Sequence, residues 1–580
     1  MTRRFTKFSM PAVSLFAALL LLALAPGALF AQSQSVSAPP AASASAATSS
    51  SSFSDAARAA AHSDPVLDAM MAEIERSKAK LKMDGVQAPY FIEYRVSDLI
   101  GDSATAIFGA SQLDQKSHAR IMRVVVRVGD YKQDSYFRNG LGIVDFAPYE
   151  NDILAMREEL WAATDRAYKA AGEAYAAKQS LAKQITLDPT INDFAPSTPL
   201  VDIEPLATLE ADSATWRKTI EDASALYRKY PEVQSVSVVL KFTAINDYYV
   251  NTEGSVTRRG EALYSLESRA STQAPDGMRL ARSPYVMVAD PKELPTTAKF
   301  VADMNAALKT LNQLRDAPIV DEEYRGPVLF DADASSDVFA ELVGSNVLGV
   351  KPEPGTTART TGDFASSYKS RVLPDFITVI DDPTRKTFDG HSLIGAYDFD
   401  DEGVKAAPIT VVDKGTLTNY LLGRLPIRDF PVSNGHGRAT PGGQATPKFG
   451  NLFLNSTNAM PLADLKKKLI DMCRDQGKPY GYFVETLGEE LSPRLLYRVW
   501  VNDGHEELVR GAVFNELDTR SIRSDLISTG DKPEVWNREG QIAETVITPA
   551  LLFDELEVKR ADTAKDKLPE YPPPPLKSAQ

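Results

Sequence analysis

Residues 326–349 read GPVLFDADASSDVFAELVGSNVLG, and this stretch decides how the second half of the chain folds. An apolar run gives way to apolar residues at helical spacing, which predicts a strand that leads into a helix. Asp331, Asp333 and Asp337 stand just before or at the helix start, where aspartates cap backbone N–H groups and complement the helix dipole. We therefore expect capping, with cation binding as the alternative. Glu341 is a lone acid in the same helix.

The sequence after this helix is mostly of β type. The turn Asp413-Lys414-Gly415-Thr416 joins two alternating runs and predicts a hairpin, because glycine adopts the positive φ that such turns need. A helix that carries Cys473 interrupts the β-rich texture, and we expect this single cysteine of the chain to be a small buried apolar residue. The β-rich runs are 375–382, 407–424, 478–488 and 494–515.

The first half of the chain mixes both element types. An amphipathic helix at 66–81 precedes three β-rich runs, and a stretch at 151–184 without proline predicts a long helix, either a scaffold helix or a coiled arm. A further helix, two strand runs and a closing helix follow, at 212–230, 233–254, 262–272 and 297–317. We place a boundary near residue 317 and expect an α+β protein, with an N-terminal α/β domain at 65–317 and a β-rich domain at 318–556.

The two ends of the chain differ from its body. Basic residues precede an apolar run from Val13 to Ala25, which predicts a secretory signal peptide at 1–31 with cleavage after Ala31; an uncleaved anchor is the alternative. We therefore expect a periplasmic or secreted protein without a stable membrane span after cleavage. A Ser/Ala/Pro-rich stretch at 32–64 predicts a disordered linker, and 557–580 reads as a proline-rich tail.

Net charge narrows the class of partner. The chain carries −14 at pH 7, and loss of the three cations of the signal peptide makes this about −17. A protein with no surplus of basic residues gains little from releasing the counterions of a phosphate backbone. We therefore expect no nucleic-acid partner.

Motifs for chemistry are sparse. The five histidines are scattered, and no two lie at the helical spacing of zinc ligands. The acidic run Asp398, Asp400, Asp401 and Glu402 is a candidate loop site for a divalent cation, or a charged turn between strands.

A glycine-rich stretch at 434–443 surrounds His436 and Arg438. Its backbone could approach a ligand closely beside a cation that suits carboxylates. We take Gly435, His436, Gly437 and Arg438 as candidate substrate-binding residues, with a flexible glycine loop as the alternative.

The order of the segments between 325 and 555 resembles the TldD/PmbA family, the predicted zinc-dependent peptidases first described as modulators of DNA gyrase. The resemblance rests on the strand and helix of 326–349, the acidic turn, SNGHGRA at 433–439, KFGNLFL at 448–454 and GYFVETLG at 481–488. It implies the TldD/PmbA-type fold for the β-rich half. The long helix at 151–184 looks like additional material.

The resemblance also implies which residues to compare with the family's zinc site. Active members carry His-Glu-x-x-x-His, with zinc on the histidines and the glutamate as general base, and a later cysteine. Here the histidine positions fall on Ala340 and Ser345 and the glutamate on Glu341, while residues 528–546 contain no cysteine. Alanine offers no donor atom and serine is a poor zinc ligand. We therefore expect no metal and no cofactor, although zinc is expected for the family, and read Glu341 as a remnant base.

The family works as a heteromer of a metal-bearing and a metal-free subunit that encloses a cavity for unfolded peptide. The resemblance therefore implies a zinc-free pairing subunit, a peptide substrate, and a homo- or hetero-oligomer with a TldD-like chain. Two alternatives remain. One is an active peptidase with a non-standard site, built on Asp398, Asp400 and Asp401 or on Glu341 with His436. The other is a periplasmic peptide-binding or scaffold protein.

Overall fold

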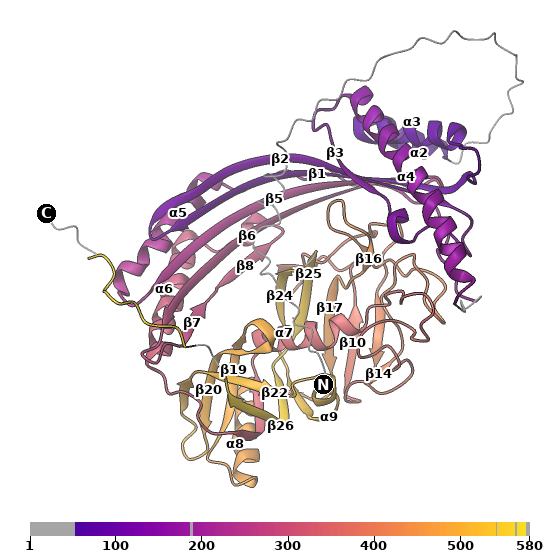
Figure 1. Ribbon diagram of the computed structural model, residues 1–580. Helices are drawn as coiled ribbons and strands as arrows, with labels where there is room; N and C mark the ends of the chain where they lie inside the picture. The colour runs from indigo at the N-terminus through magenta and orange to yellow at the C-terminus, as the bar shows by residue number, and fades with distance from the viewer. Residues whose placement is uncertain (1–52, 186–189, 541, 563–564, 576–580) are drawn as a thin grey trace, which may run out of the picture. The chain divides into compact units, whose positions relative to one another are not determined.

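The computed structural model describes residues 53–185, 190–540, 542–562 and 565–575, so the predicted signal peptide lies outside the described residues. The first half is built on a sheet of mostly long strands, antiparallel except for the parallel pair of β4 and β6 (Figure 1). Its order is β3-β2-β1-β5-β6-β4, and β7 and β8 also pair with β6. The strands are β1 Pro89–Ile107, β2 Ala110–Val128, β3 Ile143–Ala147, β4 Val201–Ile203, β5 Ser235–Asn251, β6 Val256–Gln273, β7 Arg279–Arg282 and β8 Tyr285–Val288.

The first predicted β-rich run, 89–98, and the start of the second, 104–111, belong to one strand, while the rest of the second run forms the turn and the start of β2. β1 continues through the polar residues between them and turns at Phe108 and Gly109, both with positive φ, into β2. Polar positions such as Asp102 did not end the strand because that carboxylate is paired with Arg217 of a packed helix. Strand length here is set by tertiary packing, which the local pattern does not contain.

Helices cover one face of this sheet. One apolar cluster joins the sheet to α2 (Asp55–His62), α3 (Pro65–Lys80) and α4 (Ile153–Ala182), and a second joins it to α5 (Ser213–Ser224) and α6 (Thr297–Asp316). α4 confirms the predicted long helix and packs as a scaffold helix. The predicted disordered linker at 32–64 is wrong at its end, because α2 buries Ala57 and Ala61 and Asp64 caps α3.

The second half contains two larger sheets. One has the order β14-β13-β10-β17-β25-β24; the other has β18-β23-β26-β9-β19-β20-β21, with β22 beside β26. The first is formed by β10 Ile377–Asp381, β13 Ile409–Asp413, β14 Thr416–Leu417, β17 Asn451–Ser456, β24 Glu534–Glu539 and β25 Ala543–Thr548. The second is formed by β9 Tyr324–Phe330, β18 Ala459–Met460, β19 Tyr480–Leu487, β20 Pro493–Trp500, β21 Glu506–Val509, β22 Ala512–Asn515, β23 Leu526–Gly530 and β26 Leu551–Arg560. The predicted hairpin at 413–416 is confirmed between β13 and β14.

Short elements complete this half. The hairpins β11 Thr387–Phe388 with β12 His391–Ser392, and β15 Gly437–Arg438 with β16 Thr446–Pro447, lie in its loops. Helix α7 (Ala332–Leu342) follows β9 as the opening stretch predicts, and α8 (Leu462–Asp475) and α9 (Thr519–Ser524) lie further on. Cys473 is fully buried in α8, as expected. The whole is an α+β fold, which confirms the predicted class.

The described chain from residue 53 onward forms one compact unit. The predicted boundary near 317 falls between α6 and β9 and stays a prediction. The predicted tail begins too early, because residues 557–560 belong to β26 and Lys565 bridges to Met278. Among the described residues, no helix combines the length and apolarity needed to cross a bilayer.

Candidate functional site

Helix α7 and the short turn after it carry the three positions that the resemblance singles out. Glu341 and Ser345 are exposed, whereas Ala340 is 8 % exposed and packs into the main apolar cluster of the second half. The Ser345 hydroxyl donates a hydrogen bond to the backbone oxygen of Glu341. The helix ends at Leu342, so Ala340 lies inside it and Ser345 beyond it.

The residues present do not fit a zinc ion. Ala340 brings no donor atom, and the Ser345 hydroxyl is already directed at backbone. Across the described parts of the chain, no group of three or more histidine, cysteine, aspartate or glutamate residues is placed to hold a metal. No step of a metal-dependent reaction can therefore be assigned to this helix from its own side chains.

The aspartates at the start of α7 differ from the expected capping role. Asp331 occupies the N-cap position, but its side chain makes no capping hydrogen bond. Asp337 instead forms an ion pair of 3.0 Å with Arg538 of β24, which ties the helix to the neighbouring sheet. Burial, with Asp337 close by, raises the pKa of Asp333 to about 7. The side chains respond to their tertiary neighbours more than to the helix end.

The acidic turn at 398–402 and the glycine-rich stretch at 434–443 meet in the structure. Asp400 accepts hydrogen bonds from the backbone N–H of Glu402, Val404 and Gly437, at 3.0, 2.8 and 2.9 Å. Asp401 accepts from the N–H of Ala439 at 2.7 Å. Two motifs that are far apart in the sequence thus form one buried unit.

These carboxylates do not converge as cation ligands. Asp398 points to Lys386 at 2.8 Å, while Asp400 is occupied by backbone donors and Asp401 by arginines. Asp398, Asp400 and Asp401 therefore do not form the predicted divalent-cation site.

The glycines of the stretch approach a carboxylate of the protein itself. A Cβ at Gly437 would lie 2.2 Å from Oε2 of Glu402, and one at Gly423 would lie 2.7 Å from the same atom. That oxygen also accepts the backbone N–H of Arg424 at 2.6 Å. Burial raises the pKa of Glu402 to about 7, although Arg424 opposes the rise. Because Gly423 and Gly437 have no side chains, the Glu402 carboxylate packs directly against two backbone segments.

His436 is fully enclosed. Its Nδ1 lies 3.0 Å from the backbone oxygen of Asn434, and its Nε2 lies 2.8 Å from Oδ2 of Asp381 in β10. Both His436 and Asp381 are completely buried. A ring with both nitrogens occupied has no free position for activating water, so help from His436 to Glu341 is not available in this geometry.

Arg438 is 4 % exposed, and Gly435 and Gly437 are buried as well. The guanidinium lies 4.2 Å from the centre of the Tyr397 ring and 3.2 Å from Oδ2 of Asp401. The four predicted substrate-binding residues thus face protein atoms, and their role toward a peptide stays a prediction.

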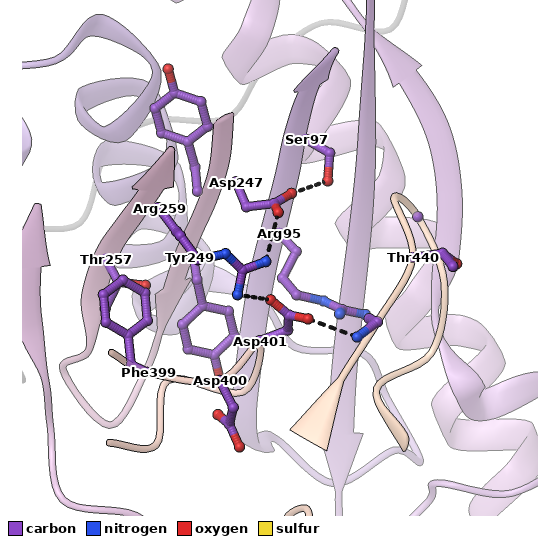
Figure 2. A pocket seen from close by; sticks show the side chains of 13 residues that line it. Arg95, Ser97, Asp247, Tyr249, Thr257, Arg259, Phe399, Asp400, Asp401 and Thr440 are labelled. Carbon is purple, nitrogen blue, oxygen red and sulfur yellow. Dashed lines mark hydrogen bonds and ion pairs between the residues drawn. The ribbon is translucent and has the colours of Figure 1, made fainter. Parts of the chain in front are cut away.

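The long sheet of the first half supplies the counter-charges. Arg259 of β6 lies 2.8 Å from Asp401 and 3.0 Å from Asp247 of β5, and Ser97 of β1 donates to Asp247 at 2.5 Å (Figure 2). Burial opposes ionisation of Asp401, but Arg259 and Arg438 outweigh it and lower its pKa to about 2. Figure 2 shows the Arg259 guanidinium between the two carboxylates.

A small cavity lies beside this cluster, lined by Arg95, Ser97, Asp247, Arg259, Asp401 and Thr440 among others. Its volume of about 30 Å³ suits a water molecule or two and is far below the size of a peptide pocket. Next to it, Arg95 and Arg123 donate to the backbone oxygens of Gly443 and Gly442. The loop is thereby fixed to the sheet.

A second anchor lies nearby at Arg424, which is fully buried. Its Nε and Nη2 donate to the backbone oxygen of Ala195 at 2.9 and 2.7 Å, and Nη2 also reaches Glu253 at 2.8 Å. The guanidinium lies 4.1 Å from the centre of the Phe194 ring. We refer to Asp400, Asp401, Glu402, Arg424 and Arg438 with Asp247, Glu253 and Arg259 as the charged joint.

The sequence analysis missed the first-half members of the charged joint. One feature of the sequence could have pointed to them: charged residues stand at buried positions of long strands, as Arg259 does in β6. Because charged side chains are seldom buried unless they are paired, such a residue predicts a partner of opposite charge. Chemically, the joint holds two halves of the chain together. It offers no exposed nucleophile with an adjacent base.

Comparison with known proteins agrees with this architecture. Residues 323–560 match the model of the PmbA/TldA metallopeptidase C-terminal domain. No curated protein matches the sequence.

Solved structures with the same fold include TldE from Thermococcus kodakarensis and proposed modulators of DNA gyrase from Thermotoga maritima and Bacteroides thetaiotaomicron. They are 14 %, 14 % and 13 % identical to this chain, in the same order, each with a TM-score of 0.55. The matches cover 84 %, 85 % and 85 % of this chain and 99 %, 99 % and 98 % of those structures. At this identity the likeness establishes the fold and nothing finer.

Proposed function

Since residues 323–560 form a PmbA/TldA-type domain and the chain has the TldD/PmbA fold, we propose that this protein is a zinc-free member of that family. In this proposal it serves as a non-catalytic or pairing subunit in the processing of peptides. Zinc chemistry needs ligands for the metal and a metal-bound water of lowered pKa. Glu341 alone would face ordinary water, whose pKa is far higher than that of zinc-bound water.

One observation carries the proposal. By the resemblance, Ala340 and Ser345 fall at the positions where active members of the family have histidines, and the described residues bring no alternative set of ligands to α7. Arg538 reaches the helix in the segment where the family's cysteine is expected, and it is bound to Asp337. A guanidinium beside the site would repel a divalent cation.

The remaining parts of the proposal concern location and partner. The N-terminal sequence supports export to the periplasm or beyond, and the negative charge argues against nucleic acid as a partner. One protein of the same fold is named TldE. By analogy with the family, the partner would be a TldD-like subunit that keeps its histidines, and the substrate an unfolded polypeptide.

The decisive experiment is a metal analysis of the purified mature protein together with a peptidase assay on an unstructured substrate such as casein. We expect far less than one zinc ion per chain and no cleavage with or without chelator. Stoichiometric zinc with chelator-sensitive cleavage would overturn the proposal. Cleavage that survives chelator but is lost in Glu341→Gln would indicate a non-standard active site instead.

The pairing role has its own test. The protein should co-purify with a histidine-bearing homologue from the same cell when both are expressed together. Saturable binding of unstructured peptide by the protein alone, without such a partner and without cleavage, would favour a peptide-binding or scaffold protein.

A further inference from the structure

Helix α4 has more apolar surface than its packing uses. One side buries Met156, Leu160, Ala163, Ala167 and Tyr168 against the sheet. A scaffold helix needs only this one apolar face, and the opposite face is normally polar. In α4 the opposite face carries large apolar residues as well.

Leu154 and Trp161 on this face are 67 % and 50 % exposed. Ile153 at the first position of the helix and Tyr149, four residues before it, are 41 % and 56 % exposed, and we call these four residues the α4 patch. Leu154 and Trp161 are seven residues apart, so they lie on the same side of the helix two turns from each other. Figure 1 shows this part of α4 beside β3. Exposed apolar residues that gather in this way mark interaction sites more often than scattered ones do.

The surroundings of the α4 patch are negatively charged. Glu150, Glu158 and Glu159 are exposed. Within the described part of the chain, no ion pair is found for any of the three. Glu158 lies between Leu154 and Trp161 on the same side of the helix.

The cations on this side of the molecule are already engaged. Arg76 and Arg157 pair with Glu73 at 2.7 and 3.5 Å, Arg166 pairs with Asp145 at 2.7 Å, and Lys169 pairs with Asp165 at 2.6 Å. The Arg76 guanidinium also lies 6.0 Å from the centre of the Trp161 ring, so it borders the patch at one edge. The patch thus combines apolar anchors with a surplus of acidic groups. Such a surface is complementary to a segment that is both apolar and basic.

We infer that the α4 patch is a docking surface for a basic amphipathic helix of a partner protein. The partner helix would lay its apolar side on Leu154 and Trp161 and bring lysine or arginine to Glu158 and Glu159. A second copy of this chain would place acid against acid across the same patch, and an anionic lipid surface would be repelled. The inference concerns a face built by α4 and does not depend on the zinc-free role proposed above.

A designed peptide can test the docking surface. The probe is a helix-forming peptide of about 18 residues with leucine on one side and lysine on the other; its twin carries glutamate in place of lysine. We expect the full mature protein to bind the lysine peptide saturably in calorimetry, more weakly as salt is added, and not to bind the glutamate twin.

Two double variants localise the binding. Leu154→Gln with Trp161→Gln removes the anchors, and Glu158→Lys with Glu159→Lys reverses the charge; each should weaken the affinity by about tenfold or more. Val432→Gln is the matched control, since Val432 is a 59 % exposed apolar residue far from α4 in the sequence. It should bind as the parent does. Because all five side chains are exposed, unchanged thermal unfolding is expected for every variant.

Several results would overturn the inference. These are the lack of saturable binding, equal binding of the glutamate twin, or unchanged affinity in both double variants. Two further results would assign the patch to another occupant: a loss of self-association in sedimentation when the anchors are replaced, or binding to phosphatidylglycerol vesicles that depends on Leu154 and Trp161.

Discussion

Arg424 illustrates how single buried charges hold this fold together. The side chain is wholly enclosed and bridges a loop of the second half to Ala195 and Glu253 of the first. A buried ion pair is not in itself strongly stabilising, but removing one partner leaves the other charge buried and unpaired. Loss of Arg424 is therefore expected to destabilise the protein mainly because Glu253 is left without its cation.

We expect Arg424→Met to lower the free energy of unfolding by about 3–5 kcal/mol, because Glu253 would lose its cation in a buried place. Urea denaturation at neutral pH measures this. Arg325→Met is the matched control, since Arg325 is 71 % exposed and its pair with Glu555 lies at the surface; the expected change there is below about 1 kcal/mol. Equal effects of the two substitutions would contradict the assigned role of Arg424.

Gly437 provides a second prediction, based on space. Its Cβ would lie 2.2 Å from Oε2 of Glu402, and the carboxylate is held in place by Arg424 N–H. Gly437→Ala should therefore lower stability by about 1–3 kcal/mol, as overpacking of a tight interior does. In the background of Glu402→Ala the clashing atoms are gone, so the same substitution should cost much less. Thermodynamic cycles from denaturant unfolding provide the comparison, and additive costs would refute the explanation.

For single residues, the sequence predicts which positions are in close contact with a charged group, but it does not predict which residue supplies that group. The stretch around His436 has glycines and a cation, which indicates close approach by something charged, and that much is found in the structure. The approaching group is Glu402 of the same chain, 35 positions before Gly437. It lies in a charged turn, and the local sequence of that turn does not predict that it is buried. Distant partners such as Arg259 and Glu253 cannot be inferred from spacing alone.

Helix α7 shows the same limit at the scale of an element. The helix and the strand before it follow from the hydrophobic pattern, and both are present. The capping role of Asp331 does not follow, because neighbouring strands supply competing interactions such as Arg538 with Asp337. The merging of the first predicted run and the start of the second into β1 has the same cause, since α5 provides a partner for Asp102.

The start of α7 also predicts a dependence on pH. Burial and the nearby Asp337 raise the pKa of Asp333 to about 7, well above the value of about 3.9 expected in the unfolded chain. Between about pH 4 and pH 7 the unfolded chain has lost this proton while the folded protein keeps it, so stability falls as the pH rises through this range, and the loss is complete above pH 7. Asp333→Asn removes this cost. The variant should gain stability over the parent by on the order of 1 kcal/mol more at pH 8 than at pH 5.

Urea unfolding of both proteins at the two pH values measures the difference. Asp518 serves as the contrasting residue: burial opposes its ionisation, but the backbone N–H groups of Ser521 and Arg520 lower its pKa. It is therefore ionised throughout this range, and Asp518→Asn should change stability equally at both pH values. A parallel response of the two variants would show that Asp333 is not the titrating group.

For the whole molecule, the sequence predicts that the two halves differ in secondary structure, but it does not predict the ion pairs that join them. The predicted boundary near residue 317 falls between α6 and β9, after the strands of the long sheet in chain order. The charged joint crosses that division, with Arg259 against Asp401 and Arg424 against Glu253 at 2.8 Å each. Separate folding would leave buried charges of both signs without partners, which costs several kcal/mol at each site.

We therefore expect neither half to fold alone to its native stability. Expressed separately, residues 53–317 and 318–580 should each unfold at a clearly lower temperature than the full chain, or lack a cooperative transition. Mixing or co-expressing the two should restore the transition, because the charges then find their partners. Introducing Arg259→Met together with Arg424→Met into the halves should abolish this recovery. Should residues 318–580 alone melt at the temperature of the intact protein, the charged joint would be dispensable, and the predicted boundary near 317 would separate two independent domains.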